Sequence, residues 1–314
     1  MGTEKASKKK IKSFKRLVTA LLVAVLFLAP VLCEVAYIFD FIPKSPSSEL
    51  LKAFGASPTD DDSEFIEFLS VGQADCTVIK SKNFTAVIDF GLPDESDAIY
   101  NRLSKLGVKD VDLAVVTHND TDHLGGYFDL AENIKIDKLL INDFSDCDDN
   151  KALYDKAIKI AKSKKTEILS PNVNDIYKIG NADLKILYSN PLAKKSNNKS
   201  IVMMLTLCGK RILFTGDLED SEENKLQLKV ADLDCDILKL GHHGSAHSTS
   251  SEFLKRTTPK IAIVSCGYDN LYNHPSDKVR ARLKEFGVKL YRTDLDENLR
   301  CEIKREKVTI FKIS

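Results

Sequence analysis

The sequence predicts an α/β protein in which β-sheets are covered by helices. Two observations lead to this fold class. Short runs rich in β-branched and other apolar residues recur through residues 64–314, and segments with apolar residues at helical spacing are interleaved with them. The body contains no internal repeat, and its length suits one large domain or two small ones.

The first 40 residues differ in composition from this body. Residues 1–16 hold seven Lys or Arg and one acid, and 17 residues without a charge follow at Leu17–Cys33. Basic residues ahead of an apolar run tend to stay in the cytoplasm. We therefore expect residues 1–40 to form a basic head and a single-pass anchor in the cell membrane, with the body extracytoplasmic. A cleaved signal peptide, which would leave a secreted body, and a cytoplasmic amphipathic segment are the alternatives.

Residues 41–63 are rich in Pro, Ser and Asp and are interpreted as a linker to a body at 64–314. The whole chain has 46 basic and 46 acidic residues, so removing residues 1–16 leaves 39 bases against 45 acids. A mildly acidic body is not typical of a protein that binds nucleic acid through charge alone. Cleavage of DNA or RNA with the help of bound cations is still open.

The elements of the body are expected in the following order. Ten runs are typical of strands: Phe65–Ser70, Cys76–Lys80, Thr85–Phe90, Leu113–Thr117, Lys138–Ile141, Ile201–Leu207, Arg211–Phe214, Asp236–Leu240, Ile261–Cys266 and Val308–Phe311. Five segments are typical of helices: 96–106, 150–164, 219–230, 250–257 and 276–286. The last of these has Gly287 just beyond its end, which is a common stop signal.

The seven cysteines show no C-x-x-C pair, and most lie in apolar, strand-like runs. We expect buried free thiols. A disulfide stays possible if the body is exported, but its pairing cannot be derived from the sequence.

The stretch Thr117–Gly126 carries two imidazoles and two carboxylates within six residues, directly after a buried strand. Four potential ligands so close together cannot share one face of a strand or helix, but they can surround a cation. The alternative is a polar turn in which Asp122 caps the next helix, and this would not explain the pair of histidines. We therefore favour a metal site at His118, Asp120, Asp122 and His123.

All six histidines of the chain fall in three places: His118 with His123, His242 with His243 and His247, and His274. The second group follows another strand, and Asp217 follows a third strand in Thr215-Gly-Asp217. Asp89 is a fourth polar residue at a strand end. Core packing does not explain why strand, sharp turn and metal ligand recur together.

The order of these motifs along the chain resembles that of the metallo-β-lactamase fold. The motifs are Asp89 and Gly91, His-x-Asp-x-Asp-His at 118–123, Thr-Gly-Asp at 215–217 and His-His-Gly at 242–244. More narrowly, the chain is similar to the hydrolase domain at the C-terminus of ComEC competence-channel proteins. The matching stretches are Phe68–Asp75, Thr117–Gly126, Asn197–Ser200, Leu240–Ser245, Tyr272–Pro275 and Tyr291–Asp294. From the sequence we expect a single anchor in place of the membrane channel that precedes this domain in ComEC proteins, so the resemblance does not by itself imply a role in DNA uptake.

The resemblance implies a four-layer αββα sandwich with two divalent metal ions at one rim. Asp122, His123 and His243 should bind one ion, His118 and Asp120 should face the other, and Asp217 should bridge them. His242 would then face the substrate and contact a phosphoryl oxygen or protonate the leaving group. The roles of the two adjacent histidines could also be reversed.

Other residues are also expected near this site. Asp89 should orient a ligand from behind rather than bind metal. His274 is expected at the mouth of the site, with a loop residue capping the next helix as an equal alternative. Most members of the family have His in place of Asp120. They also have another His before Thr-Gly-Asp, but here residues 124–241 contain no histidine. Asn197, Asn198 and Ser200 occupy the comparable place. An oxygen-rich site should admit Mn²⁺ or Mg²⁺ in competition with Zn²⁺.

Paired cations would lower the pKa of a bridging water and neutralise charge on a phosphoryl group. We therefore expect a metal-dependent phosphodiesterase that acts on DNA or another phosphodiester outside the membrane, and we do not expect β-lactamase activity. An esterase that trims phosphate-linked groups from cell-wall polymers and a non-catalytic anchored binding module are the alternatives. The sequence indicates no protein partner.

Overall fold

The computed structural model describes residues 64–81, 83–147, 149–304 and 306–313. The predicted anchor and linker, residues 1–63, lie outside this range, so the prediction of a membrane helix there stays untested. Within the described residues, none of the helices has both the length and the apolar character needed to cross a bilayer.

Two β-sheets form the centre of the described domain. The first contains eight strands in the order β15 (Lys307–Ile313), β14 (Asn298–Lys304), β1 (Phe65–Phe68), β2 (Thr77–Ser81), β3 (Phe84–Ile88), β4 (Asp110–Val116), β5 (Lys135–Ile141) and β6 (Glu167–Leu169). The second contains seven, in the order β13 (Lys289–Arg292), β12 (Ile261–Val264), β11 (Ile237–Lys239), β10 (Lys210–Phe214), β9 (Val202–Leu207), β8 (Ala182–Tyr188) and β7 (Ile176–Ile179).

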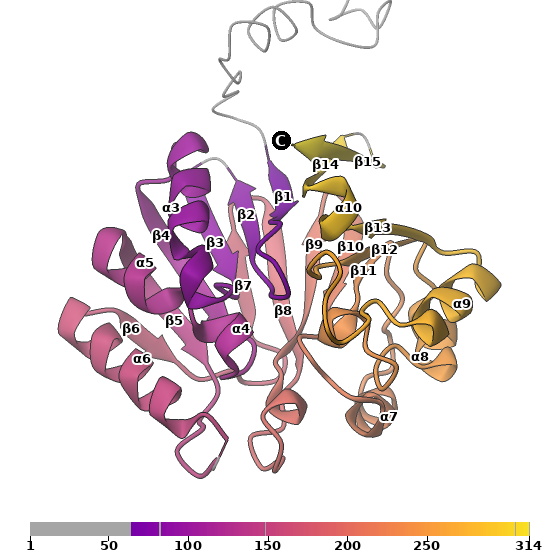
Figure 1. Ribbon diagram of the computed structural model, residues 1–314, viewed down its shortest axis with the longest axis horizontal. Coiled ribbons are helices and arrows are strands. Elements are labelled where there is room, and N and C mark those ends of the chain that lie inside the picture. The colour runs from indigo at the N-terminus through magenta and orange to yellow at the C-terminus, as the bar shows by residue number, and fades with distance from the viewer. Residues whose placement is uncertain (1–63, 82, 148, 305, 314) are drawn as a thin grey trace, which may run out of the picture. The chain divides into compact units, whose positions relative to one another are not determined.

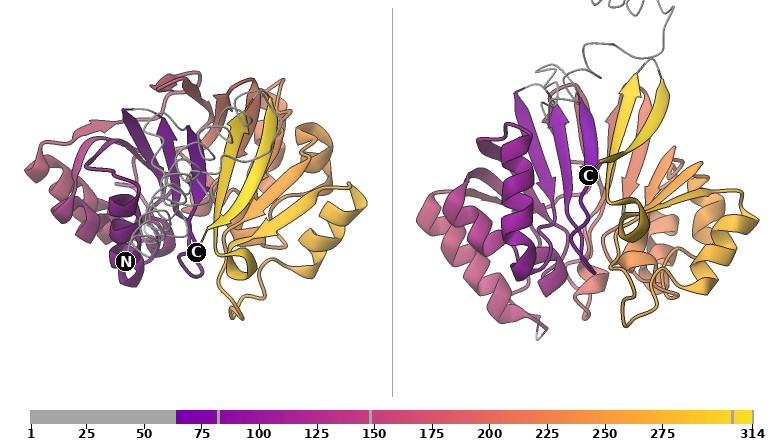
Figure 2. Two further views of the ribbon diagram at one scale, coloured as in Figure 1. Left: turned by 90° about the horizontal axis from the view of Figure 1, so that it is seen from above. Right: turned by 45° about the horizontal axis from the view of Figure 1, so that its top comes forward.

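Helices cover the outer face of each sheet (Figure 1). Against the first sheet lie α3 (Ser96–Lys105), α5 (Tyr127–Asn133) and α6 (Lys151–Lys164), and against the second lie α7 (Asp220–Lys229), α8 (Ser251–Thr257) and α9 (Asp277–Glu285). Short elements complete the described chain: α4 (Thr121–Leu124), α10 (Thr293–Asp296) and the 3₁₀ turns η1 (Pro93–Glu95), η2 (Asn197–Lys199) and η3 (Gly241–Gly244). Figure 2 shows the two sheets facing one another between the helical layers.

The alternation of side chains along each strand explains this layering. In β4, Leu113 and Val115 pack between the sheets, whereas Ala114 and Val116 pack under the helices. Because successive strand residues point to opposite faces, a strand buried on both sides becomes a continuous apolar run. The predicted sandwich of sheets and helices is therefore confirmed.

Parallel pairing places the functional loops at one edge. Strands β3 to β6 run parallel to one another, and so do strands β10 to β13. The carboxyl ends of parallel strands open on the same side of a sheet, which is where α/β proteins commonly bind ligands. The residues that follow β3, β4, β10 and β11 therefore meet, although they span residues 89 to 243 of the sequence.

The described cysteines are free thiols, and five of the six are buried, as expected; Cys208 is exposed.

Candidate metal centre at the strand ends

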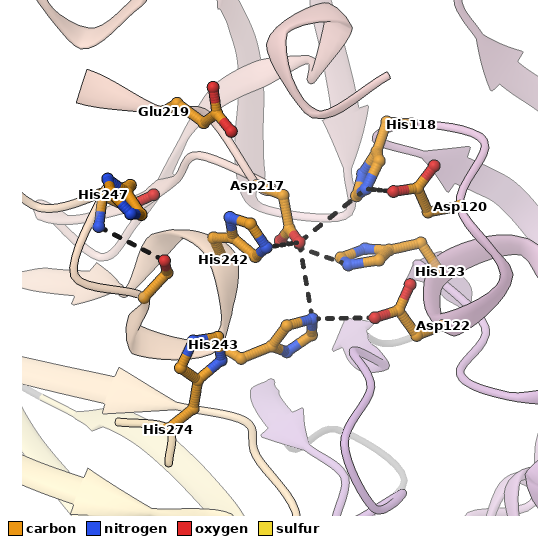
Figure 3. Close-up of polar contacts among 12 residues, drawn as sticks. His118, Asp120, Asp122, His123, Asp217, Glu219, His242, His243, His247 and His274 are labelled. Atoms are coloured by element: carbon orange, nitrogen blue, oxygen red, sulfur yellow. Dashed lines mark hydrogen bonds and ion pairs between the residues drawn. The ribbon is translucent and has the colours of Figure 1, made fainter. Parts of the chain in front are cut away.

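Asp217 occupies the middle of a group of four imidazoles (Figure 3). Its carboxylate oxygens lie 3.3 Å from Nε2 of His123, 3.5 Å from Nε2 of His243, 3.8 Å from Nε2 of His242 and 3.9 Å from Nε2 of His118. Asp217 and three of these side chains are almost fully buried, whereas the side chain of His242 is 27% exposed. The predicted ligands from three distant loops thus converge on one carboxylate.

The two remaining predicted carboxylates lie on either side of this centre. Asp122 Oδ2 is 3.3 Å from Nε2 of His243, and Asp120 Oδ2 is 3.5 Å from Nε2 of His118. Potential ligand atoms within 4.8 Å of one another fall into three overlapping sets: His118 with His123 and Asp217, Asp122 with His123 and His243, and Asp75 with Asp89 and His123. The geometry therefore offers ligand atoms for two neighbouring cations, with Asp217 and His123 between them.

Hydrogen bonds behind the imidazoles fix which ring nitrogen faces the centre. His123 Nδ1 lies 2.8 Å from Oδ2 of Asp89, and His243 Nδ1 lies 3.1 Å from the carbonyl oxygen of Ser265. A carbonyl or ionised carboxylate oxygen only accepts, so each Nδ1 must carry the proton. The lone pair of Nε2 is then directed toward the centre, which is the arrangement that metal-binding histidines adopt.

Asp89 contacts both the imidazole ring of His123 and the start of the loop that follows β4. It accepts hydrogen bonds from the backbone N–H of Thr117 and from its hydroxyl, both at 2.8 Å. Asp89 therefore lies behind His123, where it can orient the ring, and the expectation that it does not itself bind metal stays a prediction. Asp89, His242 and His243 all have φ between 51° and 58°, a left-handed conformation that non-glycine residues rarely adopt. Such strain is often retained at functional sites, where the surrounding structure enforces it.

Several buried polar atoms at this centre have no hydrogen-bond partner within the described protein. They are Oδ1 of Asp217 and Asp75, Nδ1 of His242, and Nε2 of His118, His123 and His243. A buried polar atom left without a partner costs free energy, so such atoms rarely gather at one point without a ligand. The donor set, imidazole nitrogen and carboxylate oxygen, is the set that binds divalent metal ions. The residues present therefore fit a metal centre.

The electrostatics of the cluster support the same conclusion. Burial alone would raise the pKa of Asp217, but the charges of His123 and His243 hold it well below its usual range. Burial alone would lower the pKa of His123, but Asp217 and Asp89 raise it well above its ordinary value. The pKa of His243 is raised in the same way, chiefly by Asp217 acting against burial. Negative charge is concentrated here and must be balanced by protons or by cations.

The other predicted residues lie around the cluster rather than in it. Ser200 is buried and its hydroxyl accepts the backbone N–H of Asp217 at 2.9 Å. Asn198 exchanges hydrogen bonds with Glu219, at 3.2 Å in both directions. His274 stands beside His242, with ring centroids 5.9 Å apart. Burial, with the charges of His243 and His242, lowers the pKa of His274 to about 4.

Asp122 is not the N-cap of the following helix. That position belongs to Asp120, whose side chain makes no capping hydrogen bond; instead, Asn150 Nδ2 donates to Asp120 Oδ1 at 2.8 Å. His247, which shares a sequence motif with His242, is exposed and lies outside the cluster (Figure 3).

The sequence did not predict a buried ion pair that lies behind His243. Lys239 Nζ donates to Asp75 Oδ2 at 2.8 Å, and Asp75 Oδ1 lies 3.6 Å from His243 Nδ1. Burial would raise the pKa of Asp75, but Lys239 holds it below its ordinary value. The two partners are 164 residues apart, so only the fold reveals the pair. The polar end of the stretch Phe68–Asp75 was the one available signal.

Comparison with known proteins indicates the family to which this domain is similar. Residues 69–143 match the metallo-beta-lactamase superfamily. The chain is 31% identical over 205 residues to ComE operon protein 3 of Bacillus subtilis, which covers 64% of this chain and 26% of that protein. It is 29% identical over 251 residues to competence protein ComA of Neisseria gonorrhoeae, covering 77% of this chain and 33% of that protein. The chain thus spans about a quarter to a third of the curated relatives it matches.

Solved structures support the fold. The β-hydroxylase CmlA of Streptomyces venezuelae aligns with a TM-score of 0.52 at 16% identity, over 81% of this chain and 59% of that one. The metallo hydrolase Igni18 of Ignicoccus hospitalis aligns with a TM-score of 0.50 at 14% identity, over 76% of this chain and all of that one. Together with the family match at residues 69–143, the sequence comparisons show that the chain carries a metallo-β-lactamase domain. It is homologous to ComE operon protein 3 and ComA, which are ComEC-type competence proteins, and the family resemblance of its motifs is confirmed.

Proposed function

We propose that this protein is a metal-dependent phosphodiesterase that cleaves DNA or a related phosphodiester. The observation that carries the proposal is the convergence of imidazole nitrogens and carboxylate oxygens on Asp217. Metallo-β-lactamase superfamily members are generally hydrolases, and this donor set fits divalent cations. The names of the relatives, which include competence protein ComA and recombination protein 2 of Haemophilus influenzae, favour DNA as the substrate.

His118, Asp120 and Asp217 would hold one cation, and Asp122, His123, His243 and Asp217 would hold the other. Bound divalent cations supply Lewis acidity, which activates water and neutralises the charge that develops on a phosphoryl group. The chain's own residues prepare this site: Asp89 and the carbonyl of Ser265 fix the tautomers of His123 and His243, and Ser200 holds the backbone of Asp217.

His242 is the residue proposed to meet the substrate. Its side chain is partly exposed while His243 beside it is buried, so the two neighbours are suited to different tasks. From the rim, His242 would donate a hydrogen bond to a phosphoryl oxygen or a proton to the leaving oxygen. Asp120 makes its side of the centre richer in oxygen, which favours Mn²⁺ or Mg²⁺ beside Zn²⁺. The proposal also includes extracytoplasmic action from a membrane anchor in residues 1–40.

The test is an incubation of the full 314-residue chain with single-stranded DNA, duplex DNA and a chromogenic phosphodiester, each with Mn²⁺, Mg²⁺ or Zn²⁺. We expect hydrolysis that EDTA abolishes and that falls by at least about tenfold in Asp122→Ala. Asp220→Ala, at an exposed carboxylate close in sequence to Asp217, is the matched control and should retain activity. Activity on the chromogenic ester but not on DNA would indicate the cell-wall alternative, and cleavage unchanged in Asp122→Ala would contradict the proposal.

A further inference from the structure

A loop with exposed aromatic side chains borders the metal centre. Residues 265–276 connect β12 to α9, and within them Tyr268 is 78% exposed, Leu271 is 96% exposed and Tyr272 is 68% exposed. Large apolar side chains that gather on an exposed surface frequently mark a binding site. Neither the catalytic proposal nor the packing of the core accounts for them.

The loop connects to the centre through a series of rings. Tyr272 stacks on His274 with 5.7 Å between ring centroids and 28° between ring planes, and His274 lies 5.9 Å from His242. His242 Nε2 is in turn 3.8 Å from Asp217. The exposed face of Tyr272 is therefore only a few side chains from the proposed cations.

Hydrogen bonds hold this stack in place. Asn270 Nδ2 donates to the carbonyl oxygen of His274 at 2.7 Å, and its Oδ1 accepts the backbone N–H of His274 at 2.9 Å. Gln73 Oε1 accepts the backbone N–H of Gly267 at 3.0 Å, which directs Gln73 Nε2 toward His274 Nδ1 at 3.3 Å. The loop is thus preorganised, and a ligand would lose less free energy in ordering it.

The cleft beside the stack suits an uncharged group better than a second phosphate. It measures about 390 Å³, and Tyr272, His274, Arg280 and Arg292 contribute to its walls. Both arginines are already paired with carboxylates, Arg280 with Asp277 and Arg292 with Asp294. A phosphate would gain little from cations that are already neutralised, whereas an aromatic base can stack on Tyr272.

We propose that Tyr272 and His274 form a platform on which one unpaired nucleobase stacks while the neighbouring phosphodiester lies at the metal centre. The inference rests on the proposed function and deepens it, because it assigns single-stranded nucleic acid as the substrate class. Bases inside a duplex have their faces covered by neighbouring bases and cannot use such a platform. Stacking on an aromatic side chain tolerates every base, so little sequence preference is expected.

The test measures binding without hydrolysis. Fluorescence anisotropy in EDTA would compare the full chain's affinity for a labelled oligothymidine and for an abasic sugar–phosphate chain of equal length and charge. Base stacking is worth about 1–3 kcal/mol, so we expect the oligothymidine to bind roughly fivefold or more tightly. Tyr272→Ala should remove this preference, Tyr272→Phe should retain it, and Tyr100→Ala, at a partly exposed tyrosine in α3, should not change it.

Equal affinity for the two chains in the wild-type protein, or a preference that survives Tyr272→Ala, would overturn the platform. Binding that depends on Tyr272 but not on bases would assign it to a sugar–phosphate polymer and would also overturn the proposal. Hydrolysis of a chromogenic phosphodiester, measured in parallel, keeps the two proposals separate. Hydrolysis without base preference refutes only the platform, and base preference without hydrolysis refutes only the phosphodiesterase.

Discussion

Asp217 is the residue on which the two halves of the centre depend, because its carboxylate lies 3.3–3.9 Å from four imidazoles. It belongs to the loop after β10, and the histidines come from the loops after β4 and β11. A single carboxylate between two ligand sets can neutralise and align both. Removing it would leave the four imidazoles without the carboxylate that they share, and each would retain at most its own peripheral partner, such as Asp89 behind His123 or Asp122 beside His243.

Asp89 offers a test of how the ligands are oriented. In Asp89→Asn, one carboxamide must replace a carboxylate that accepts from Thr117 and from His123 Nδ1, and its NH₂ group cannot accept either bond. We predict a 10–100-fold loss of metal affinity with the fold retained. Calorimetric titration with Mn²⁺ and circular dichroism would measure the two quantities. Unchanged affinity would show that Asp89 does not position His123.

Asp120 offers a test of metal preference. Replacing it by His, the residue that most relatives of this fold are expected to carry there, exchanges a hard oxygen ligand for a softer nitrogen. We predict that Asp120→His raises the ratio of bound Zn²⁺ to bound Mn²⁺ when both metals are supplied at equal concentration. Elemental analysis after removal of free metal would measure this ratio. A ratio that does not move, or that falls, would refute the role assigned to Asp120.

Among the elements, the strand-end turns show why glycine is needed at specific places. Gly216 has φ of +52°, and a Cβ at this position would lie 2.7 Å from Ser200 Oγ and 3.0 Å from Thr117 Cβ. Both neighbours are buried and both support the centre. The backbone at Gly216 therefore has to pass close to them for Asp217 to reach the imidazoles.

Gly216→Ala and Gly107→Ala form a matched pair for this claim. Gly107 also has positive φ, +69°, but a Cβ there meets no atom within 4 Å. We predict a loss of about 1–2 kcal/mol for Gly107→Ala from the left-handed backbone alone. The loss for Gly216→Ala should exceed it by at least about 1 kcal/mol because atoms must also shift. Urea unfolding of both variants measures the difference, and equal losses would contradict the close approach.

The sequence predicted most of the long elements of the described domain but did not predict the strands β6, β7, β8, β13 and β14 or the helices α4, α5 and α10. All ten predicted strand runs and all five helix segments correspond to observed elements. β14 (Asn298–Lys304) was missed because its alternate residues Arg300 and Glu302 are charged. Arg300 pairs instead with Glu67 on β1, 2.9 Å away. The buried residues Leu299, Cys301 and Ile303 of β14 alternate with its charged ones, a period-2 pattern that is a weaker signal than a continuous apolar run.

The candidate site could likewise be predicted only in part from the sequence. The ligands between His118 and His123 could be recognised because residue types that bind metal lie within six positions of one another in the sequence. Asp75 and Lys239 were not, since each looks ordinary until the fold brings them together. The stack of Tyr272 on His274 likewise depends on a loop conformation held by Asn270 and Gln73.

At the scale of the whole molecule, metal binding should be coupled to stability and to pH. In the metal-free protein, Asp217 raises the pKa of His123 and His243 against the effect of burial. The stability that these protonated imidazoles contribute is fully present below the unfolded pKa of about 6.5 and is lost as pH rises through the folded values. The stability that the Asp217 carboxylate contributes depends on pH in the opposite direction. Because its pKa lies well below the ordinary value, this stability is present at neutral pH and is lost only when strong acid protonates the carboxylate.

A cation takes the place of those protons, and proton competition weakens as pH rises. We therefore predict that the increase in Tm caused by saturating Mn²⁺, relative to EDTA, grows between pH 6 and pH 9. Differential scanning fluorimetry of the full chain across this range would measure it. An increase that is constant or that shrinks with pH would show that the metal does not bind at the imidazoles.

The central claim is that loops far apart in the sequence meet to bind divalent cations, and metal content tests it most directly. Elemental analysis of the purified chain after equilibration with Zn²⁺ or Mn²⁺ should find up to two ions per chain in the wild-type protein and in Asp220→Ala. Asp217→Ala and His123→Ala should each lose metal while remaining folded by circular dichroism. Wild-type protein that holds no metal at any supply, or variants that retain their full content, would contradict the account.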